Sequence, residues 1–284
     1  MGVRDIIVVL DETRRSEVRL AMAADLARTN DAHLIGLCPL DLIALPATTS
    51  FEIAGYAESI VLDVIARMRA QARERATPIE TRFREQLRIN NLQGEWRLAD
   101  GPAADVVVRQ ARSADVVILG QNDPDDPPQP QAKHLVEHML FGSGRPVLVI
   151  PYAGQFSSIG RRVLIGWNES REATRAVHDA LPLIRPDAAV TLLSVTRNAA
   201  GASEDFSTVE IAAHLARHGL SVTTADLPRG DVRAEDLLLN QASEMGADLV
   251  VIGGYGHSRL REMVLGGVTR SLLKSMVAPV LMSH

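Results

Sequence analysis

The sequence predicts an α/β protein built from two tandem copies of one unit, each a doubly wound, mainly parallel five-stranded sheet with helices on both faces. Three observations predict this fold. Short sequence patterns recur between the two halves, apolar runs of strand length alternate with segments of helical periodicity, and aromatic residues make up only 4% of the chain. Scarce aromatics with abundant Ala, Val, Leu and Ile are typical of buried parallel strands under helices.

Three pairs of segments carry the duplication. Residues 4–13, 113–120 and 145–150 reappear as residues 161–170, 246–253 and 278–283. A repeated unit predicts two similar domains. We place the first at residues 1–152 and the second at 158–284, with a Gly- and Ser-rich linker between them. At 284 residues the chain is long enough for each domain to bury its own core.

The first repeat alternates strands with helices. Residues 5–10 are almost entirely apolar, which is the pattern of a strand covered on both faces. In the next segment Val18, Met22 and Leu26 recur at helical spacing. The expected strands are 5–10, 32–38, 95–99, 115–119 and 146–150, and the expected helices are 14–29, 52–92, 102–112 and 134–141. Pro78 predicts a break or kink in the long helix.

The second repeat follows the same alternation. Its expected strands lie near 162–167, 189–195, 220–226, 248–252 and 280–283, and its helices near 171–184, 204–218, 232–245 and 267–276. This order implies right-handed crossovers and a mainly parallel sheet. Ligands of such sheets bind outside the carboxyl ends of the strands, where the strand order reverses. The positions after the first and fourth strands are Asp11 and Gly120 in the first repeat and Asn168 and Gly253 in the second.

Composition and charge exclude several classes of function. The formal net charge is -5, which makes the chain as a whole unsuited to holding nucleic acid by its phosphates. No stretch is long and apolar enough for a membrane span and no secretory signal is visible, so we expect a soluble, cytoplasmic protein. The single cysteine, Cys38, excludes an internal disulfide and fits a reducing compartment. Because Cys38 ends an apolar run, we expect it to be a small buried hydrophobe.

A cluster of glycines distinguishes the second repeat from the first. Gly253-Gly-Tyr-Gly256 directly follows a strand, and Gly266-Gly267 opens a helix after a further nine residues. Glycines allow close backbone approach and the N–H groups at a helix start attract anions, which together favour a phosphate site. Nearby positive charge comes from Arg259, Arg261 and Arg270. A tight turn followed by a packed helix start is the alternative that the spacing leaves open.

These residues resemble the universal stress protein family. Its nucleotide-binding members carry Gly-x-x-Gly, nine residues and then Gly-Ser or Gly-Thr after the fourth strand, an acidic residue after the first strand, and a closing Pro-Val-Leu-Val strand. The match is most specific over residues 256–284, and the repeated pattern extends it to both halves, so the chain resembles a tandem member. The resemblance implies an adenine nucleotide alpha hydrolase-like fold and a role in the stress response.

The resemblance also implies the residues of an adenine nucleotide site. They are Asn168, Val195, Gly253, Gly256, Gly266, Gly267, Val268 and Thr269. The glycines would surround the phosphates and ribose, the backbone of Val195 would contact adenine, and ATP or a related nucleotide would bind, with Mg²⁺ held only through it. Two positions depart from the family pattern. Asn168 stands where the family has Asp, and Gly267 stands where a Ser or Thr hydroxyl would reach phosphate.

The first repeat keeps Asp11 but not the glycines. Residues 121–130 contain three aspartates, which oppose phosphate, and four prolines, which remove backbone donors. We therefore interpret the first domain as a degenerate partner that binds no nucleotide. Single-domain members of the family pair through their final strands. Here residues 147–150 and 280–283 would be exposed apolar edges, so we expect them to pair within the chain as a pseudo-dimer, with further homodimerisation left open.

The leading hypothesis is a binding module with little or no catalysis: a cytoplasmic stress-response protein whose second domain binds ATP or a related adenine nucleotide. No general base, nucleophile or Walker-type lysine accompanies the glycines. The runner-up is an interaction protein of the same fold that binds no nucleotide and docks an unknown protein partner. An enzyme ranks last, because the turns after the two first strands lack the glycines of related nucleotide-activating enzymes.

Two further patterns favour structural roles. His134-Leu-Val-Glu137-His138 matches a metallopeptidase motif. A third ligand is missing and the second repeat has none of these residues, so we expect no metal site. Asp11 is expected to cap the helix that follows it rather than to act in catalysis.

Overall fold

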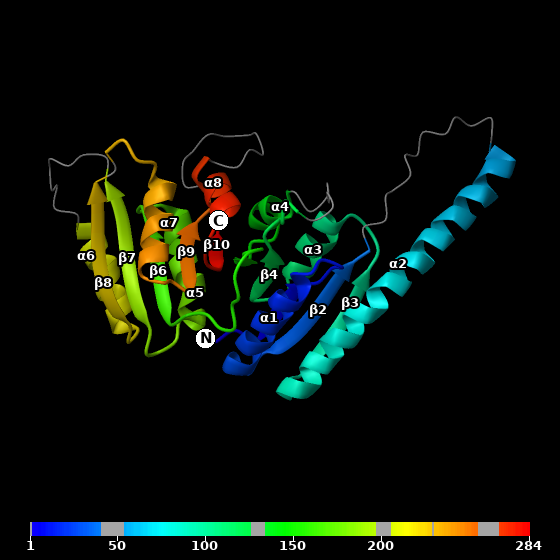
Figure 1. Cartoon of the computed structure of the whole chain (residues 1–284), viewed down its shortest axis with the longest axis horizontal. Helices are drawn as coiled ribbons and strands as arrows, with labels where there is room; N and C mark the ends of the chain where they lie inside the picture. Colours follow the sequence, from blue (N-terminus) through cyan, green and yellow to red (C-terminus); the bar gives the residue numbers. More distant parts are fainter. Residues whose placement is uncertain (1, 41–53, 126–133, 197–205, 229, 255–266) are drawn as a thin grey trace.

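The structure is a computed structural model that describes residues 2–40, 54–125, 134–196, 206–228, 230–254 and 267–284. These residues form a single ten-stranded sheet with helices on both of its faces (Figure 1). The first five strands come from the N-terminal half of the chain and the last five from the C-terminal half. The division into domains at 1–152 and 158–284 stays a prediction that agrees with this arrangement.

The N-terminal half contributes a parallel five-stranded part of the sheet in the order β3-β2-β1-β4-β5. Its strands are β1 (Asp5–Val9), β2 (His33–Pro39), β3 (Gly94–Ala99), β4 (Val116–Gly120) and β5 (Val147–Ile150). Its helices are α1 (Ser16–Asn30), α2 (Ala54–Asn90), α3 (Ala103–Ala111) and α4 (Leu135–Gly142). The strand order reverses between β1 and β4, as the alternating sequence pattern leads one to expect.

The C-terminal half repeats this order as β8-β7-β6-β9-β10. Its strands are β6 (Arg162–Trp167), β7 (Ala189–Thr196), β8 (Ser221–Pro228), β9 (Leu249–Gly253) and β10 (Val280–Ser283). Its helices are α5 (Arg171–Ala180), α6 (Phe206–Arg217), α7 (Ala234–Glu244) and α8 (Gly267–Ser275). The helix expected over 171–184 ends at Ala180 and is followed by a short 3₁₀ turn, Leu181–Leu183, which contains Pro182.

The two final strands pair with each other, which confirms the expected pseudo-dimer. β5 and β10 are antiparallel, whereas the neighbouring strand pairs within each half are parallel. The paired residues are Val147 with Met282, Leu148 with Leu281, and Val149 with Val280. All six are at most 1% exposed. This pairing joins the two expected five-stranded sheets into one continuous sheet and removes an unprotected apolar edge from each half.

The core consists of two apolar layers on opposite faces of the sheet. Successive residues of a strand point to opposite faces, so Ile6 and Val8 of β1 belong to one layer and Ile7 and Val9 to the other. Both layers include residues from both halves of the chain. The near-continuous apolar strands of the sequence are explained by this burial on both sides.

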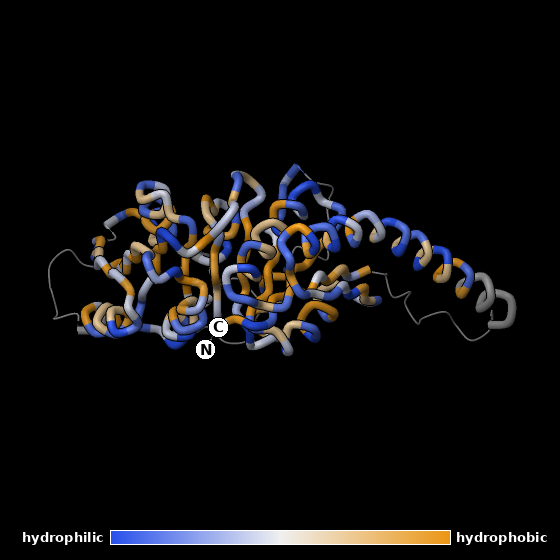
Figure 2. Tube along the Cα trace, turned by 90° about the horizontal axis from the view of Figure 1, so that it is seen from below, coloured by the Kyte–Doolittle hydropathy of each residue, from blue (hydrophilic) through white to orange (hydrophobic). Residues whose placement is uncertain are grey.

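Helix α2 runs without interruption through Pro78, so of the predicted break or kink the break is wrong. Ala76, Ile79 and Phe83 are buried on either side of the proline, and this packing stabilises the helix where one backbone hydrogen bond is lost. The N-terminal part of α2 extends well beyond the sheet (Figure 1). Figure 2 shows polar and apolar residues alternating along this helix, and a mixture of apolar and polar segments in the body of the protein.

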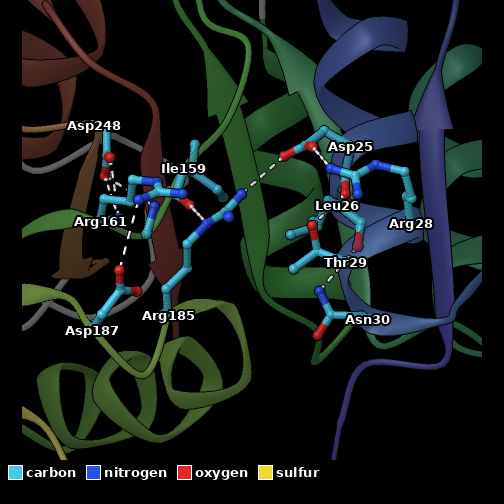
Figure 3. Close-up of polar contacts among 11 residues, drawn as sticks. Asp25, Leu26, Arg28, Thr29, Asn30, Ile159, Arg161, Arg185, Asp187 and Asp248 are labelled. Carbon is cyan, nitrogen blue, oxygen red and sulfur yellow. Dashed lines mark hydrogen bonds and ion pairs between the residues drawn. The ribbon is translucent and has the colours of Figure 1, made fainter.

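In each half, an aspartate just before the fourth strand binds the backbone at the start of the first strand. The carboxylate of Asp115 accepts hydrogen bonds from the backbone of Arg4 and Asp5, and the carboxylate of Asp248 accepts them from Gly160, Arg161 and Arg162. These contacts explain the Ala-Asp pair that both repeats carry before their fourth strand. Figure 3 shows Asp248 in this role beside a contact between the halves, in which Arg185 reaches Asp25 of α1 at 3.3 Å.

Candidate functional site

The strand order reverses at two places, between β1 and β4 and between β6 and β9. We call these the first and the second switch point. In open α/β sheets the carboxyl ends of the strands at such a point form the usual ligand site. The sequence places its nucleotide prediction at the second switch point, and the structure allows the two points to be compared residue by residue.

Asn168 follows β6 at the second switch point and organises a tight turn. Its Oδ1 accepts hydrogen bonds from the backbone N of Ser170 at 3.3 Å and from the Ser170 Oγ at 2.7 Å. Glu169 between them has a positive φ of 60°, which the turn requires. Ser170 then caps α5, because its Oγ accepts from the backbone N of Ala173 at 3.1 Å. The amide oxygen of Asn168 is therefore engaged, and its Nδ2 is the donor that it can present to a ligand.

Gly253 ends β9 and lies directly against the first turn of α5. A Cβ atom added at Gly253 would lie 2.4 Å from the backbone N of Ala173 and 2.6 Å from the carbonyl carbon of Glu172. No side chain fits in this space. The packing of the end of β9 against the start of α5 therefore requires a glycine at position 253. This packing explains the glycine without a direct phosphate contact.

Helix α8 begins at Gly267, and so the helix start expected from the glycine pattern is confirmed. Val268 lies in its first turn, and Thr269 is 4% exposed. Gly256 and Gly266 fall outside the described residues, as do Arg259 and Arg261. Arg270 lies on α8 and is exposed.

Val195 lies near the end of β7, the strand next to β6. It is half-buried and pairs with Leu227 of β8. Because β6, β7 and β9 are parallel neighbours, their carboxyl ends meet at one edge of the sheet. The structure therefore brings Asn168, Val195 and Gly253 to the same edge, and their roles toward a nucleotide remain predictions.

The first switch point is filled by an ion pair that sequence analysis missed. Arg19 of α1 is 3% exposed, and its Nη2 lies 2.6 Å from Oδ2 of Asp11. Its Nε donates to the carbonyl oxygen of Val9 at 3.2 Å. A Cβ added at Gly120 would lie 2.3 Å from Nη1 of Arg19, so the guanidinium group rests on the end of β4.

Asp11 does not cap α1, so the predicted capping role is wrong. The helix starts at Ser16, and its N-cap residue, Arg15, makes no side-chain cap hydrogen bond. Asp11 instead accepts from the backbone N of Thr13 at 2.9 Å and pairs with Arg19. The turn after β1, residues 10–15, is longer than the turn after β6, residues 168–170.

The two repeats differ at the position of Arg19. Ala176 lies as far after Asn168 as Arg19 lies after Asp11, and it is 0% exposed. A small apolar residue therefore occupies the place that holds a guanidinium group in the first half. Aligning the repeats beyond their strand ends would have revealed this difference, since a charged residue replaces an alanine within an otherwise apolar helix face.

Cys38 at the end of β2 is buried near this ion pair. Burial, with the charges of Asp11 and Glu12 adding to it, raises the pKa of the Cys38 thiol to about 12. A thiol with such a pKa stays protonated at neutral pH and reacts slowly. The interpretation of Cys38 as a small buried hydrophobe agrees with its 6% exposure.

The His-x-x-Glu-His motif lies at the start of α4. The ring Nδ1 of His134 is 2.8 Å from a carboxylate oxygen of Glu137, and the Nδ1 of His138 is 2.8 Å from the carbonyl oxygen of His134. Within the described part of the chain, no three His, Cys, Asp or Glu side chains are grouped so that they could hold a metal ion. The motif is explained by contacts of the helix with itself.

A comparison with known protein families finds a match to the C-terminal half of the chain. The model of the universal stress protein family matches residues 160–284. No curated protein is similar enough in sequence to match the chain. None of the described helices combines the length and the apolar character needed to cross a membrane.

Solved structures resemble the chain over almost its whole length. A universal stress protein from Archaeoglobus fulgidus DSM 4304 matches with a TM-score of 0.76 and 14% identity, covering 99% of this chain and 96% of that one. A protein assigned to the same family from Pseudomonas aeruginosa UCBPP-PA14 matches with a TM-score of 0.60 and 16% identity, covering 99% and 93%. At these identities the likeness shows a shared fold, including the tandem arrangement of its two halves.

Proposed function

The chain belongs to the universal stress protein family through residues 160–284 and has the fold of a tandem member, and from this premise we propose that its C-terminal half binds ATP or a related adenine nucleotide. The proposed site lies at the second switch point. It comprises Asn168, Val195, Gly253, Gly256, Gly266, Gly267, Val268 and Thr269. The proposed role is regulatory, in a stress response, with little or no catalysis.

The contrast between the two switch points is the observation that carries this proposal. At the first, the buried guanidinium of Arg19 and the carboxylate of Asp11 neutralise each other on the end of β4. At the second, Ala176 replaces the arginine, and the polar group next to β6 is the uncharged amide of Asn168. The second switch point therefore lacks the guanidinium group that rests on the strand end at the first, and this difference favours ligand binding in the second half over the first.

The helix start at Gly267 supplies the second part of the argument. Backbone N–H groups at a helix start carry partial positive charge and attract phosphate. The first turn of α5 cannot serve in the same way, because Ser170 accepts the hydrogen bond of Ala173 and Gly253 covers the adjacent backbone. We therefore assign the phosphates to the start of α8 and the ribose and adenine to the ends of β6 and β7.

A pair of substitutions at one position tests the proposal in the full-length protein. Gly266→Asp places a carboxylate at the proposed phosphate position, and Gly266→Asn places an amide of nearly the same size there. We expect ATP binding, measured by isothermal titration calorimetry with and without Mg²⁺, to be abolished by the Asp variant and only weakened by the Asn variant. Equal binding by both variants would place the phosphates elsewhere.

Thermal unfolding of the same variants separates function from folding. An acidic residue at a helix start is compatible with the helix dipole, so both variants should melt close to the wild type. If both instead unfold at much lower temperature, Gly266 is structural and the glycine pattern loses its weight as a binding signal. A bound nucleotide released by denaturing freshly purified protein would support the proposal independently.

The second candidate function is that of an interaction protein of the same fold that binds no nucleotide. The observation that favours it is the presence of exposed apolar side chains in the N-terminal part of α2. Leu62, Val64 and Met68 are 59%, 44% and 37% exposed. A wild-type protein that shows no heat of binding with ATP, yet elutes as a complex with another protein from cell extract, would favour this second function.

A further inference from the structure

A side chain of the first half, that of Gln121, forms hydrogen bonds with helix α8 of the second half. Gln121 follows β4 at the first switch point. Its Nε2 donates a hydrogen bond to the carbonyl oxygen of Leu273 at 2.7 Å and a second to that of Lys274 at 3.1 Å. Both acceptors belong to the last turn of α8, which begins at Gly267.

The remaining polar group of the Gln121 amide is also engaged. Its Oε1 accepts a hydrogen bond from the backbone N of Tyr152 at 3.0 Å. This network fixes the orientation of the amide, because two carbonyl acceptors require the NH₂ group and one N–H donor requires the oxygen. The backbone N of Gln121 donates to the carbonyl oxygen of Ile150 at 2.8 Å, so main chain and side chain are both held.

The corresponding residue of the second half has no side chain. The backbone N of Gly254 donates to the carbonyl oxygen of Ser283 at 2.8 Å, in the same way as Gln121 donates to Ile150. A Cβ added at Gly254 would lie 3.3 Å from Cδ1 of Leu140 in α4. The contact from Gln121 to α8 therefore has no counterpart from Gly254 to α4.

The two equivalent helices end in different ways. Ser143 closes α4 locally, since its Oγ donates to the carbonyl oxygen of Met139 at 2.6 Å. The last carbonyl groups of any α-helix lack partners within the helix and need such a donor. In α8 that donor comes from Gln121, which belongs to the other half of the chain.

We propose that the N-terminal half acts as a clamp on α8 through Gln121, and so controls the position of the helix start at Gly267. A helix of nine residues is too short to be stable by itself and depends on its tertiary contacts. It is also rigid along its length, so fixing its last turn fixes the direction of its first. The degenerate half then acts on nucleotide binding without binding nucleotide, a consequence that rests on the proposed function.

Hydrogen exchange tests the clamp in the full-length protein. We expect Gln121→Met, which keeps the size but removes the donor, to increase amide exchange in peptides covering 267–276 by about five- to tenfold, the effect of one or two lost hydrogen bonds. Gln121→Glu should increase it further, because a carboxylate would face the carbonyl ends of the helix. Peptides covering α4, which is closed by its own Ser143, should exchange as in the wild type.

A second glutamine provides the matched control. Gln110 accepts a hydrogen bond from Arg97 within the first half at 2.7 Å, and among the described residues it forms no hydrogen bond with α8. Gln110→Met should leave exchange in α8 unchanged. Unchanged exchange of α8 in Gln121→Met would overturn the clamp, and so would equal acceleration of α4 and α8, which indicates a general loss of stability.

ATP affinity of the same variants tests the consequence for the site. We expect Gln121→Met to weaken ATP binding about five- to tenfold and Gln110→Met to leave it unchanged. Faster exchange of α8 with unaltered ATP affinity would overturn the control of the site by the clamp. Absence of ATP binding by the wild type would contradict the proposed function instead, and the exchange experiment would still decide whether Gln121 holds α8.

Discussion

Two adjacent glycines at the end of β9 should respond very differently to the same substitution. In Gly253→Ala the added methyl group would lie 2.4 Å from the backbone N of Ala173 and 2.9 Å from its Cα. Backbone atoms of a capped helix cannot move without shifting α5. In Gly254→Ala the methyl group would lie 3.3 Å from Cδ1 of Leu140, a side-chain end that can rotate away.

The expected magnitudes follow from these neighbours. Forcing a methyl group into a packed site costs about 1–3 kcal/mol, and the lower entropy of an unfolded alanine returns about 0.4–1 kcal/mol. With three backbone contacts below 3 Å, we expect Gly253→Ala to lie near the upper end, at about 2–3 kcal/mol of lost stability. For Gly254→Ala the two effects nearly cancel, so we expect a change within about 0.5 kcal/mol.

Urea unfolding of the full-length variants, followed by far-ultraviolet circular dichroism, measures this difference. The midpoint for Gly253→Ala should fall clearly below that of the wild type while the slope of the transition stays the same. Thermal melting should show a decrease of about 4–12 °C for Gly253→Ala, since 1 kcal/mol corresponds to about 2–4 °C in larger domains. A neutral Gly253→Ala would refute the close packing of α5 on β9 as the reason for a glycine at this position.

Three further outcomes are expected. Leu281→Asp buries a charge between β5 and β10 and should lower the free energy of unfolding by more than about 3 kcal/mol. The cooperative urea transition should then shift to low denaturant or disappear. Burial, together with the charges of His218 and His178, lowers the pKa of His214. The unfolded chain therefore takes up the proton first as the pH falls, so the free energy of unfolding should decrease below about pH 6.5. Urea midpoints at pH 7.5 and 5.5 should show this decrease in the wild type and a smaller one in His214→Gln. Cys38 should not react with a thiol reagent at pH 8 until urea unfolds the protein, and rapid labelling of the native state would contradict its burial and its raised pKa.

The strand pattern could be predicted from the sequence because burial on both faces leaves a simple signal. Each central strand is a run of apolar residues bounded by polar ones, and the structure places β1 and β6 within a residue or two of the expected ranges. The duplication supplied the order of the remaining elements. The pairing of β5 with β10 could be inferred because both strands are short, apolar and without another partner on one side.

Features that depend on tertiary packing were harder to predict. Pro78 has a strong local preference against a helix interior, but burial of Ile79 and Phe83 outweighs it in α2. We expected α1 to start at residue 14, whereas it starts at Ser16. Asp11 has the residue type of a helix cap, but its carboxylate pairs with Arg19 of α1 instead. Local sequence gives no information on such competing partners.

In the candidate site, too, local features could be predicted from the sequence and tertiary contacts could not. Glycine spacing correctly indicated a helix start at Gly267, which is a local property of the chain. It could not distinguish a glycine required by packing from one required by a ligand. Gly253 has α5 backbone where a side chain would be, a contact that depends on the fold of a segment some eighty residues earlier in the chain. Gln121 was unremarkable in sequence for the same reason, since its partners lie in the other half.

The first half has a structural role even though it lacks the glycine pattern. The continuous sheet requires both final strands, since removing the first half would expose β10 as an apolar edge. At the first switch point the buried guanidinium group of Arg19 pairs with the partly exposed carboxylate of Asp11 and rests on Gly120, at the end of β4. Gln121, the next residue, holds the last turn of α8. The ion pair and the hydrogen bonds to α8 therefore meet at two adjacent residues, Gly120 and Gln121, so we expect substitutions at this strand end to affect α8 even though they lie in the first half.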